Sequence, residues 1–193
     1  TVEVVLKDLD YKYKEDMFAK SQSLLGSFHT NISSASSTER RANIARAAES
    51  INGYIIYPEE VFSTNNAFGK RISSNGYKKA PIIVKGEMVD DVGGGICQVS
   101  SSLYMAALYS ELQIVERQNH SLKVGYADYA YDATLVDGAI DLKIKNNTKF
   151  PVYIESSVIN NKVIVNIYGN ERRNSNIKLS FQNELVQKIN PPA

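Results

Sequence analysis

The chain contains one cysteine, Cys97, which follows Ile96 and three consecutive glycines at positions 93–95. After it, apolar residues recur at helical spacing, at Val99, Leu103, Ala106 and Ala107. This spacing predicts an amphipathic helix that begins close to Cys97, where the unpaired N–H groups of the first turn favour a thiolate over a thiol. Glycines also let backbone amides approach a substrate closely, as stabilisation of an oxyanion requires. The pattern therefore predicts a nucleophilic cysteine; the alternative is a small buried hydrophobic side chain behind a tight turn.

A nucleophilic cysteine needs a base, and the chain has two histidines. His120 lies between the β-like runs 113–116 and 122–126, where its ring can face back toward the start of the helix. An activated Cys–His pair also needs a third group that fixes the imidazole. A backbone carbonyl can do this, as can a carboxylate downstream, and we rank Asp132 ahead of Asp137 and Asp141. His29 has no comparable setting, and we expect it on the surface or in a loop.

Composition excludes several other functions. One cysteine and two separated histidines lack the ligand spacing of a zinc site, so we expect no metal and no cofactor. Lys and Arg (22) nearly balance Asp and Glu (21), which argues against nucleic acid as a partner. A single cysteine cannot form a disulfide within the chain.

The pattern of apolar residues favours an α+β fold. A second helix is predicted by the stripe Ile44, Ala47, Ala48 and Ile51, with Ser36 and Glu39 as a capping box. The runs 152–158 and 163–168 flank Asn160 and Asn161, which is a hairpin signal. We therefore predict a short-stranded antiparallel or mixed sheet with two main helices and the catalytic cysteine at a helix N-terminus.

The chain is long enough for one domain with a short appendage. We predict a tail or linker from a preceding domain at 1–25, a catalytic domain at 26–170 and a C-terminal extension at 171–193. Apolar runs fall short of the ~18 residues that span a bilayer. We expect the chain to be a fragment of a longer protein, with membrane contact only through an N-terminal anchor outside it.

Several motifs, in their order along the chain, resemble the VanW domain family. They are RANI at 41–44, VFSTN at 61–65, GKR at 69–71, GGGICQVSSSLY at 93–104, ERQNHS at 116–121 and DAT at 132–134. The resemblance runs from about Arg41 to Gly169. The chain departs from the family pattern at Ser102, where threonine is expected, and in 127–131, which lacks the expected Pro and Gly. Neither departure includes the predicted nucleophile or base.

The resemblance implies a location at the bacterial cell surface, outside the cytoplasm, and work on peptidoglycan stem peptides. It implies an L,D-transpeptidase in which Cys97 attacks the carbonyl of the third stem residue and forms a thioester. An amine of a neighbouring stem then resolves the thioester into a 3-3 cross-link. The resemblance also implies that His120 acts as general base and later as general acid. The oxyanion would be held by the backbone amides of Gly94, Gly95, Ile96 and Gln98.

A stem peptide offers carboxylates and amides, which predicts cationic and hydroxyl groups around the thiol. Arg71 and Arg117 could clamp carboxylates, and hydrogen bonds could come from Ser100, Ser101 and Tyr126. The two serines could instead satisfy the backbone of the first helical turn. Two other functions stay open: a cysteine-dependent peptidoglycan carboxypeptidase or endopeptidase, in which water resolves the thioester, and a non-catalytic wall-binding module with an inert cysteine.

Overall fold

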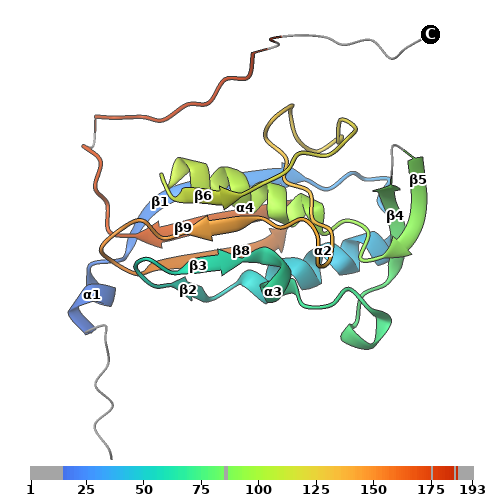
Figure 1. The fold of residues 1–193 in the computed structure, drawn as a ribbon, viewed down its shortest axis with the longest axis horizontal. Helices are drawn as coiled ribbons and strands as arrows, with labels where there is room; N and C mark the ends of the chain where they lie inside the picture. Colours follow the sequence, from blue (N-terminus) through green and yellow to red (C-terminus); the bar gives the residue numbers. More distant parts are fainter. Residues whose placement is uncertain (1–14, 85–86, 175, 185, 187–193) are drawn as a thin grey trace, which may run out of the picture.

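A four-stranded antiparallel sheet forms one layer of the computed structural model (Figure 1). Its strands, in spatial order, are β1 (Ser23–Asn31), β9 (Lys162–Gly169), β8 (Val152–Ile159) and β2 (Tyr54–Ile56). The structure describes residues 15–84, 87–174, 176–184 and 186. Residues 1–14 of the predicted tail lie outside this part of the chain.

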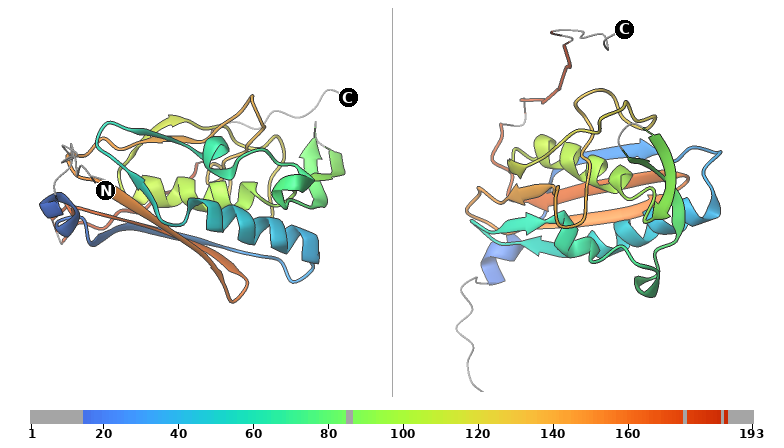
Figure 2. Two further views of the ribbon diagram at one scale, coloured as in Figure 1. Left: turned by 90° about the horizontal axis from the view of Figure 1, so that it is seen from below. Right: turned by 45° about the vertical axis from the view of Figure 1, so that its right-hand side comes forward.

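The two main helices pack against one face of this sheet. They are α2 (Thr38–Ile51) and α4 (Cys97–Tyr109). A second antiparallel sheet of β3 (Val61–Ser63), β7 (Lys143–Lys145) and β6 (Gln113–Glu116) lies on their other side (Figure 2). Helix α4 is therefore enclosed between two sheets, whereas α2 keeps an exposed face, and the predicted α+β class is confirmed.

Enclosure between layers explains the composition of α4. Its predicted apolar stripe is buried, but so are Gln98, Ser100, Ser101 and Ser102, which occupy its other faces. The prediction of an amphipathic helix was thus wrong for α4, because a helix buried on nearly all sides needs small or apolar residues all round. Its polar residues carry hydroxyl or amide groups that find partners inside the protein.

The second predicted helix and the predicted hairpin are confirmed with small changes. The predicted stripe of α2 is buried, and the side chain that caps the helix is that of Ser37 instead of Ser36. The β8–β9 hairpin turns at Asn160 and Asn161, which have φ values of 51° and 58°. Positive φ at both central residues is what a two-residue type I′ turn requires, and asparagine tolerates it.

Strand β1 is the main element that the sequence does not reveal. It begins at Ser23, inside the predicted tail, and pairs with β9 along its length. Its alternation of buried and exposed residues is interrupted by a register shift between Leu24 and Gly26. At Gly26 a side chain would place its Cβ 2.5 Å from the carbonyl oxygen of Ala106 in α4. The glycine is needed there because strand and helix backbones approach each other closely.

The remaining elements are short. They are α1 (Glu15–Ala19), α3 (Thr64–Phe68), the 3₁₀ turn η1 (Ser73–Asn75), and the hairpin of β4 (Lys79–Val84) and β5 (Glu87–Val92). The β-like run 122–126 is not a strand, and it belongs to a long loop between β6 and β7. His29, expected on the surface or in a loop, is exposed on β1.

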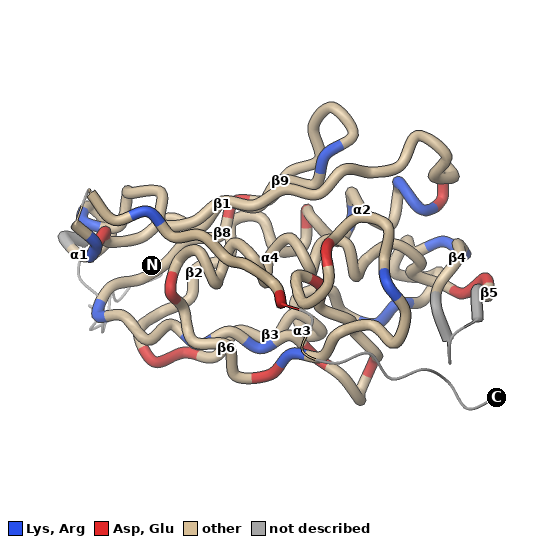
Figure 3. The backbone as a smooth tube through the Cα atoms, turned by 90° about the horizontal axis from the view of Figure 1, so that it is seen from above, with Lys and Arg blue, Asp and Glu red and all other residues tan. Residues whose placement is uncertain are grey.

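The C-terminal extension contacts the domain. Arg173 donates to the carbonyl oxygens of Tyr109 and Leu25, and the Tyr131 hydroxyl donates to the carbonyl of Phe181 at 2.6 Å. Charges of both signs are spread along the chain (Figure 3). None of the helices in the described part of the chain combines the length and the apolar character needed to span a bilayer.

Candidate active site

The glycine turn at 93–95 positions Cys97 at the first residue of α4. Gly93 and Gly95 have φ values of +94° and +108°, a region that side chains strongly disfavour. At Gly94 a Cβ would lie 2.4 Å from the carbonyl oxygen of Ala80 in β4, so the reason for this glycine is close packing of two backbones. The thiol is half-buried and free.

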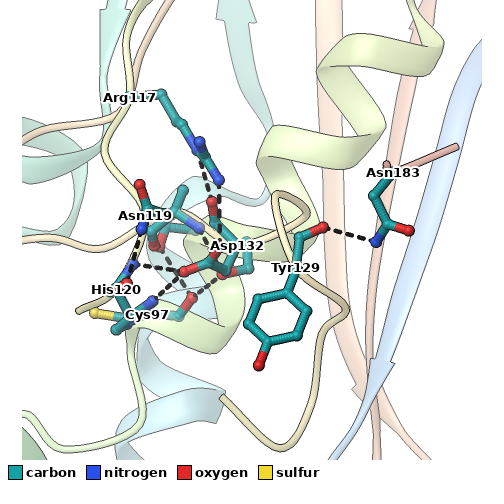
Figure 4. A network of polar contacts seen from close by, with 10 residues as sticks. Cys97, Arg117, Asn119, His120, Tyr129, Asp132 and Asn183 are labelled. Carbon is teal, nitrogen blue, oxygen red and sulfur yellow. Dashed lines mark hydrogen bonds and ion pairs between the residues drawn. The ribbon is translucent and has the colours of Figure 1, made fainter. Parts of the chain in front are cut away.

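His120 and Asp132 are brought together by the loop between β6 and β7. The His120 Nδ1 lies 2.6 Å from Asp132 Oδ2, and the same oxygen accepts the backbone N–H of His120 at 2.6 Å (Figure 4). The other two candidate aspartates lie elsewhere. Asp137 is exposed, and Asp141 accepts from the Ser63 hydroxyl and the Asn65 N–H at the start of α3.

The His120 ring is the hydrogen-bonding partner that lowers the pKa of the Cys97 thiol. Because Nδ1 faces Asp132, this bond falls to Nε2. Burial alone would raise the pKa of Cys97, but the hydrogen bond and charge of His120, with further donation from Leu135 N–H and the Thr134 hydroxyl, lower it. The thiolate form is thereby favoured.

The pKa of His120 moves in the opposite direction. Burial lowers it, but the hydrogen bonds and charges of Asp132 and Cys97 outweigh burial and raise the pKa to about 9. The pKa of Asp132 is lowered, because His120 and Arg117 oppose the effect of its burial. These shifts therefore favour the thiolate of Cys97, the imidazolium of His120 and the carboxylate of Asp132 relative to the same groups in water.

Arg117 is engaged with Asp132 in this structure. Its Nε donates to the Asp132 carbonyl at 2.8 Å, and its Nη2 lies 3.2 Å from Oδ1. The guanidinium also stacks over the Tyr104 ring, 5.0 Å from its centre. These contacts indicate that Arg117 positions the Asp132 carboxylate. That Arg117 binds a carboxylate of the substrate stays a prediction.

Ser100 and Ser101 bind the loop that carries Asp132. Both are buried; Ser100 donates to the Ala133 carbonyl at 2.6 Å, and Ser101 accepts the Ala133 N–H at 2.9 Å. Both hydroxyls also donate to the Cys97 carbonyl. The two serines were predicted either to bind substrate or to satisfy backbone groups, and the contacts show the second. Their hydrogen bonds join α4 directly to the loop.

Tyr126 lies beside the thiol. Its ring meets the His120 ring edge-on at 6.4 Å, and its hydroxyl hydrogen-bonds to Ser101. Burial, followed by the charge of Cys97, raises the pKa of Tyr126, which is therefore a neutral phenol. A pocket of about 160 Å³ borders the loop and is lined by His120 and Asp132, but not by Cys97.

The four amides predicted for the oxyanion are not equivalent. Ile96 N–H donates to the Gly93 carbonyl at 3.3 Å, and Gln98 N–H donates to the Gly95 carbonyl at 3.0 Å. Within the described residues, the N–H groups of Gly94, Gly95 and Cys97 have no backbone acceptor. Gly94 is buried, so the half-buried Gly95 and Cys97 are the amides best placed to hold an oxyanion.

Sequence reasoning missed Thr134 and Arg40 at this site. Thr134 is the last residue of the DAT motif at 132–134 that carried the VanW resemblance, so its signal was present. Arg40 lies 57 positions before the cysteine, on α2, and no local pattern connects the two. Arg71, by contrast, was predicted, and its stem packs on Gly93 while its Nη1 donates to Asn65 at 2.8 Å.

Comparisons with known proteins agree with the resemblance found in the motifs. The family model described as VanW like protein matches residues 39–168. The chain is 39% identical over 154 residues to the uncharacterized protein YoaR of Bacillus subtilis, covering 80% of this chain and 50% of YoaR. It is 28% identical over 143 residues to the vancomycin B-type resistance protein VanW of Enterococcus faecalis, covering 72% of this chain and 52% of that protein.

The chain spans about half the length of these curated relatives. No solved structure matches it. The family model covers well over half of the chain, including Cys97, His120 and Asp132, and the chain therefore belongs to the VanW family.

Proposed function

We propose that this protein is a cysteine acyltransferase of the cell wall, of the L,D-transpeptidase type, that acts on peptidoglycan stem peptides outside the cytoplasm. The observation that carries the proposal is the Cys97–His120–Asp132 arrangement, in which the carboxylate contacts the imidazole at 2.6 Å and the imidazole lowers the pKa of the thiol. The vancomycin-resistance relative supports the cell-wall setting.

In the first half of the reaction, the Cys97 thiolate attacks the carbonyl carbon of the third stem residue and forms a C–S bond. The oxyanion receives hydrogen bonds from the N–H groups of Gly95 and Cys97. When it collapses, the C–N bond to the terminal D-alanine breaks, and protonated His120 donates a proton to the departing amine.

In the second half, neutral His120 accepts a proton from the side-chain amine of a neighbouring stem. That amine attacks the thioester, a C–N bond replaces the C–S bond, and Cys97 leaves as a thiolate. Asp132 keeps Nδ1 protonated throughout, so that Nε2 is the atom that exchanges the proton. If water attacks in place of the amine, the same residues give a carboxypeptidase.

The test is the intact mass of the protein after incubation with a tetrapeptide-stem muropeptide. The expected result is an adduct with the mass of the muropeptide less D-alanine on the wild-type protein and none on Cys97→Ala. A cross-linked product after addition of an acceptor stem supports transfer, whereas a shortened stem alone identifies the hydrolase. A wild-type protein that forms no adduct and releases no D-alanine contradicts both enzymes and leaves the non-catalytic module.

A further inference from the structure

We infer that Arg40 is the residue that recognises the substrate's carboxylate at this site, and that the group it recognises is the free carboxylate of the terminal residue of the donor stem. The inference rests on the proposed function for the identity of the substrate. It begins from an arginine that contacts Gln98, the residue after Cys97, and that has no carboxylate partner among the described residues.

Arg40 lies in the first turn of α2, against the start of α4. Its Nη2 donates to Gln98 Oε1 at 3.2 Å, and Gln98 directly follows the cysteine. A Cβ at Gly95 would lie 3.0 Å from the Cγ of Arg40, so the arginine stem packs directly on the glycine turn. The charge of Arg40 also acts on Tyr126, the phenol that is close to Cys97.

Gln98 holds the guanidinium in place. The Gln98 amide nitrogen donates to the Asn31 carbonyl at 2.9 Å and to Thr30 Oγ1 at 3.2 Å, both on β1. These two acceptors fix the amide so that its oxygen faces Arg40. Because a neutral oxygen takes only one of five guanidinium donors, the others stay available to a ligand.

The arginines around the site differ in what they contact. Arg117 is paired with Asp132. Within the described residues, Arg40 and Arg71 are within ion-pair distance of no carboxylate, yet only Arg40 is tied to a residue next to Cys97. A half-buried arginine with free donors is suited to bidentate binding of a carboxylate.

The chemistry of the donor stem matches this position. In a tetrapeptide stem the carboxylate carbon of the terminal residue is two bonds beyond the scissile nitrogen, so it lies close to the sulfur when the thiolate attacks. Helices α2 and α4 also begin at the same end of the molecule, which adds two positive dipole ends there (Figures 1 and 2). Arg40 is thus placed to bind the leaving group and to favour donors with a free terminus.

The first experiment needs no stem peptide. Alkylation rates of Cys97 are measured with iodoacetate and with iodoacetamide, which share a leaving group and differ by one charge. The ratio of the two rates is compared with the ratio for the same thiol in the urea-unfolded chain. We expect the folded protein to show a ratio at least several-fold higher, and Arg40→Gln to lower the ratio roughly five- to ten-fold with an unchanged iodoacetamide rate.

Arg40→Lys keeps the positive charge, so its ratio of iodoacetate to iodoacetamide rates should stay close to that of the wild-type protein. Arg46→Gln is the matched control on α2, because Arg46 stacks over Tyr77 and has no contact with Gln98. An unchanged ratio in Arg40→Gln overturns the inference, as does a loss of the ratio in Arg71→Gln alone. If Arg40→Gln also slows alkylation by iodoacetamide, circular dichroism shows whether the variant is folded. The ratio of the two rates still tests the inference, because a change in thiol reactivity affects both reagents equally.

The second experiment uses tetrapeptide stems with a terminal acid or a terminal amide. We expect the wild-type protein to form the acyl-enzyme at least ten-fold faster from the acid, and Arg40→Gln to react with both at similar rates. Equal rates with acid and amide in the wild-type protein overturn the role of Arg40 but leave the proposed transfer intact. If the folded protein prefers iodoacetate but forms no acyl-enzyme from either stem, the result supports the anion-binding role of Arg40 and contradicts the proposed function.

Discussion

One carboxylate oxygen of Asp132 contacts His120 twice, at 2.6 Å from the ring Nδ1 and at 2.6 Å from the backbone N–H. The same carboxylate lies beside Arg117, which fixes its other oxygen. The orientation of the imidazole is therefore determined from both its main chain and its ring. This relationship makes a specific prediction for the aspartates of the loop.

Asp132→Asn should lower the rate of acyl transfer roughly 10²- to 10⁴-fold, because an amide in contact with Nδ1 can favour the wrong tautomer of the ring. Asp137→Asn is the matched control, since Asp137 is exposed in the same loop and should retain wild-type turnover. Turnover is measured by release of D-alanine. Equal losses in the two variants would mean that another group orients His120.

The lowered pKa of Cys97 predicts reactivity at mildly acidic pH. Alkylation by iodoacetamide should follow a profile with its midpoint below pH 7.5, whereas the ordinary pKa is 9.0. His120→Ala should shift the midpoint upward and slow acylation by ~10² or more, because the thiolate loses its main partner. A wild-type midpoint at the ordinary value would contradict the activated thiol.

Stability should depend on pH in a way that reveals the coupled pair. The raised pKa of His120 stabilises the fold below its ordinary value of 6.5 and loses that effect as pH rises through about 9. The lowered pKa of Cys97 stabilises the fold above 9.0 and loses that effect as pH falls toward its folded pKa. As pH rises from 6.5 toward 9, the stabilising effect of His120 decreases and that of Cys97 increases, so the two slopes oppose each other.

The wild-type free energy of unfolding should therefore change little across this window. Cys97→Ala leaves only the effect of Asp132 on His120, so its stability should decrease as pH rises above 6.5, by up to about 1.4 kcal/mol per pH unit, until pH passes the folded pKa of His120 in the variant. Urea unfolding at several pH values measures both curves. Parallel curves for the two proteins would show that the thiol and the imidazole do not form an ion pair.

Gly94→Ala tests the close packing of the turn on β4. The new methyl group would lie 2.4 Å from the Ala80 carbonyl oxygen, so either the strand or the turn must move. We expect a loss of about 1 to 3 kcal/mol of stability and slower alkylation of Cys97. Gly125→Ala is the control, because no atom lies within 4 Å of its Cβ position and its φ is not positive. Comparable losses in the two variants would refute this explanation of Gly94.

Ser101→Ala tests the joint between α4 and the loop. It removes the acceptor of the buried Ala133 N–H, which should cost about 1 to 3 kcal/mol in urea unfolding. Acyl transfer should also slow, because Ala133 adjoins Asp132. Ser34→Ala, at an exposed loop position, should be neutral. Wild-type stability in Ser101→Ala would mean that water replaces the hydroxyl.

Local rules in the sequence determined much of the site. A triple glycine followed by helical periodicity placed the cysteine at a helix start, because turn chemistry and apolar spacing act over a few residues. The asparagine pair fixed the β8–β9 turn for the same reason. The ranking of Asp132 came from triad logic and agrees with the contact found, although nearness in sequence alone could not separate it from Asp137 and Asp141.

Only the tertiary structure decided which partner each polar side chain takes. Arg117 contacts Asp132 and Arg40 reaches Gln98 because the loop and α2 pack against the start of α4, over separations of 15 and 58 residues. Burial of α4 between two sheets turned its serines inward, and β1 formed although its alternation is broken by Gly26. These outcomes depend on contacts between distant segments, which composition and periodicity do not encode.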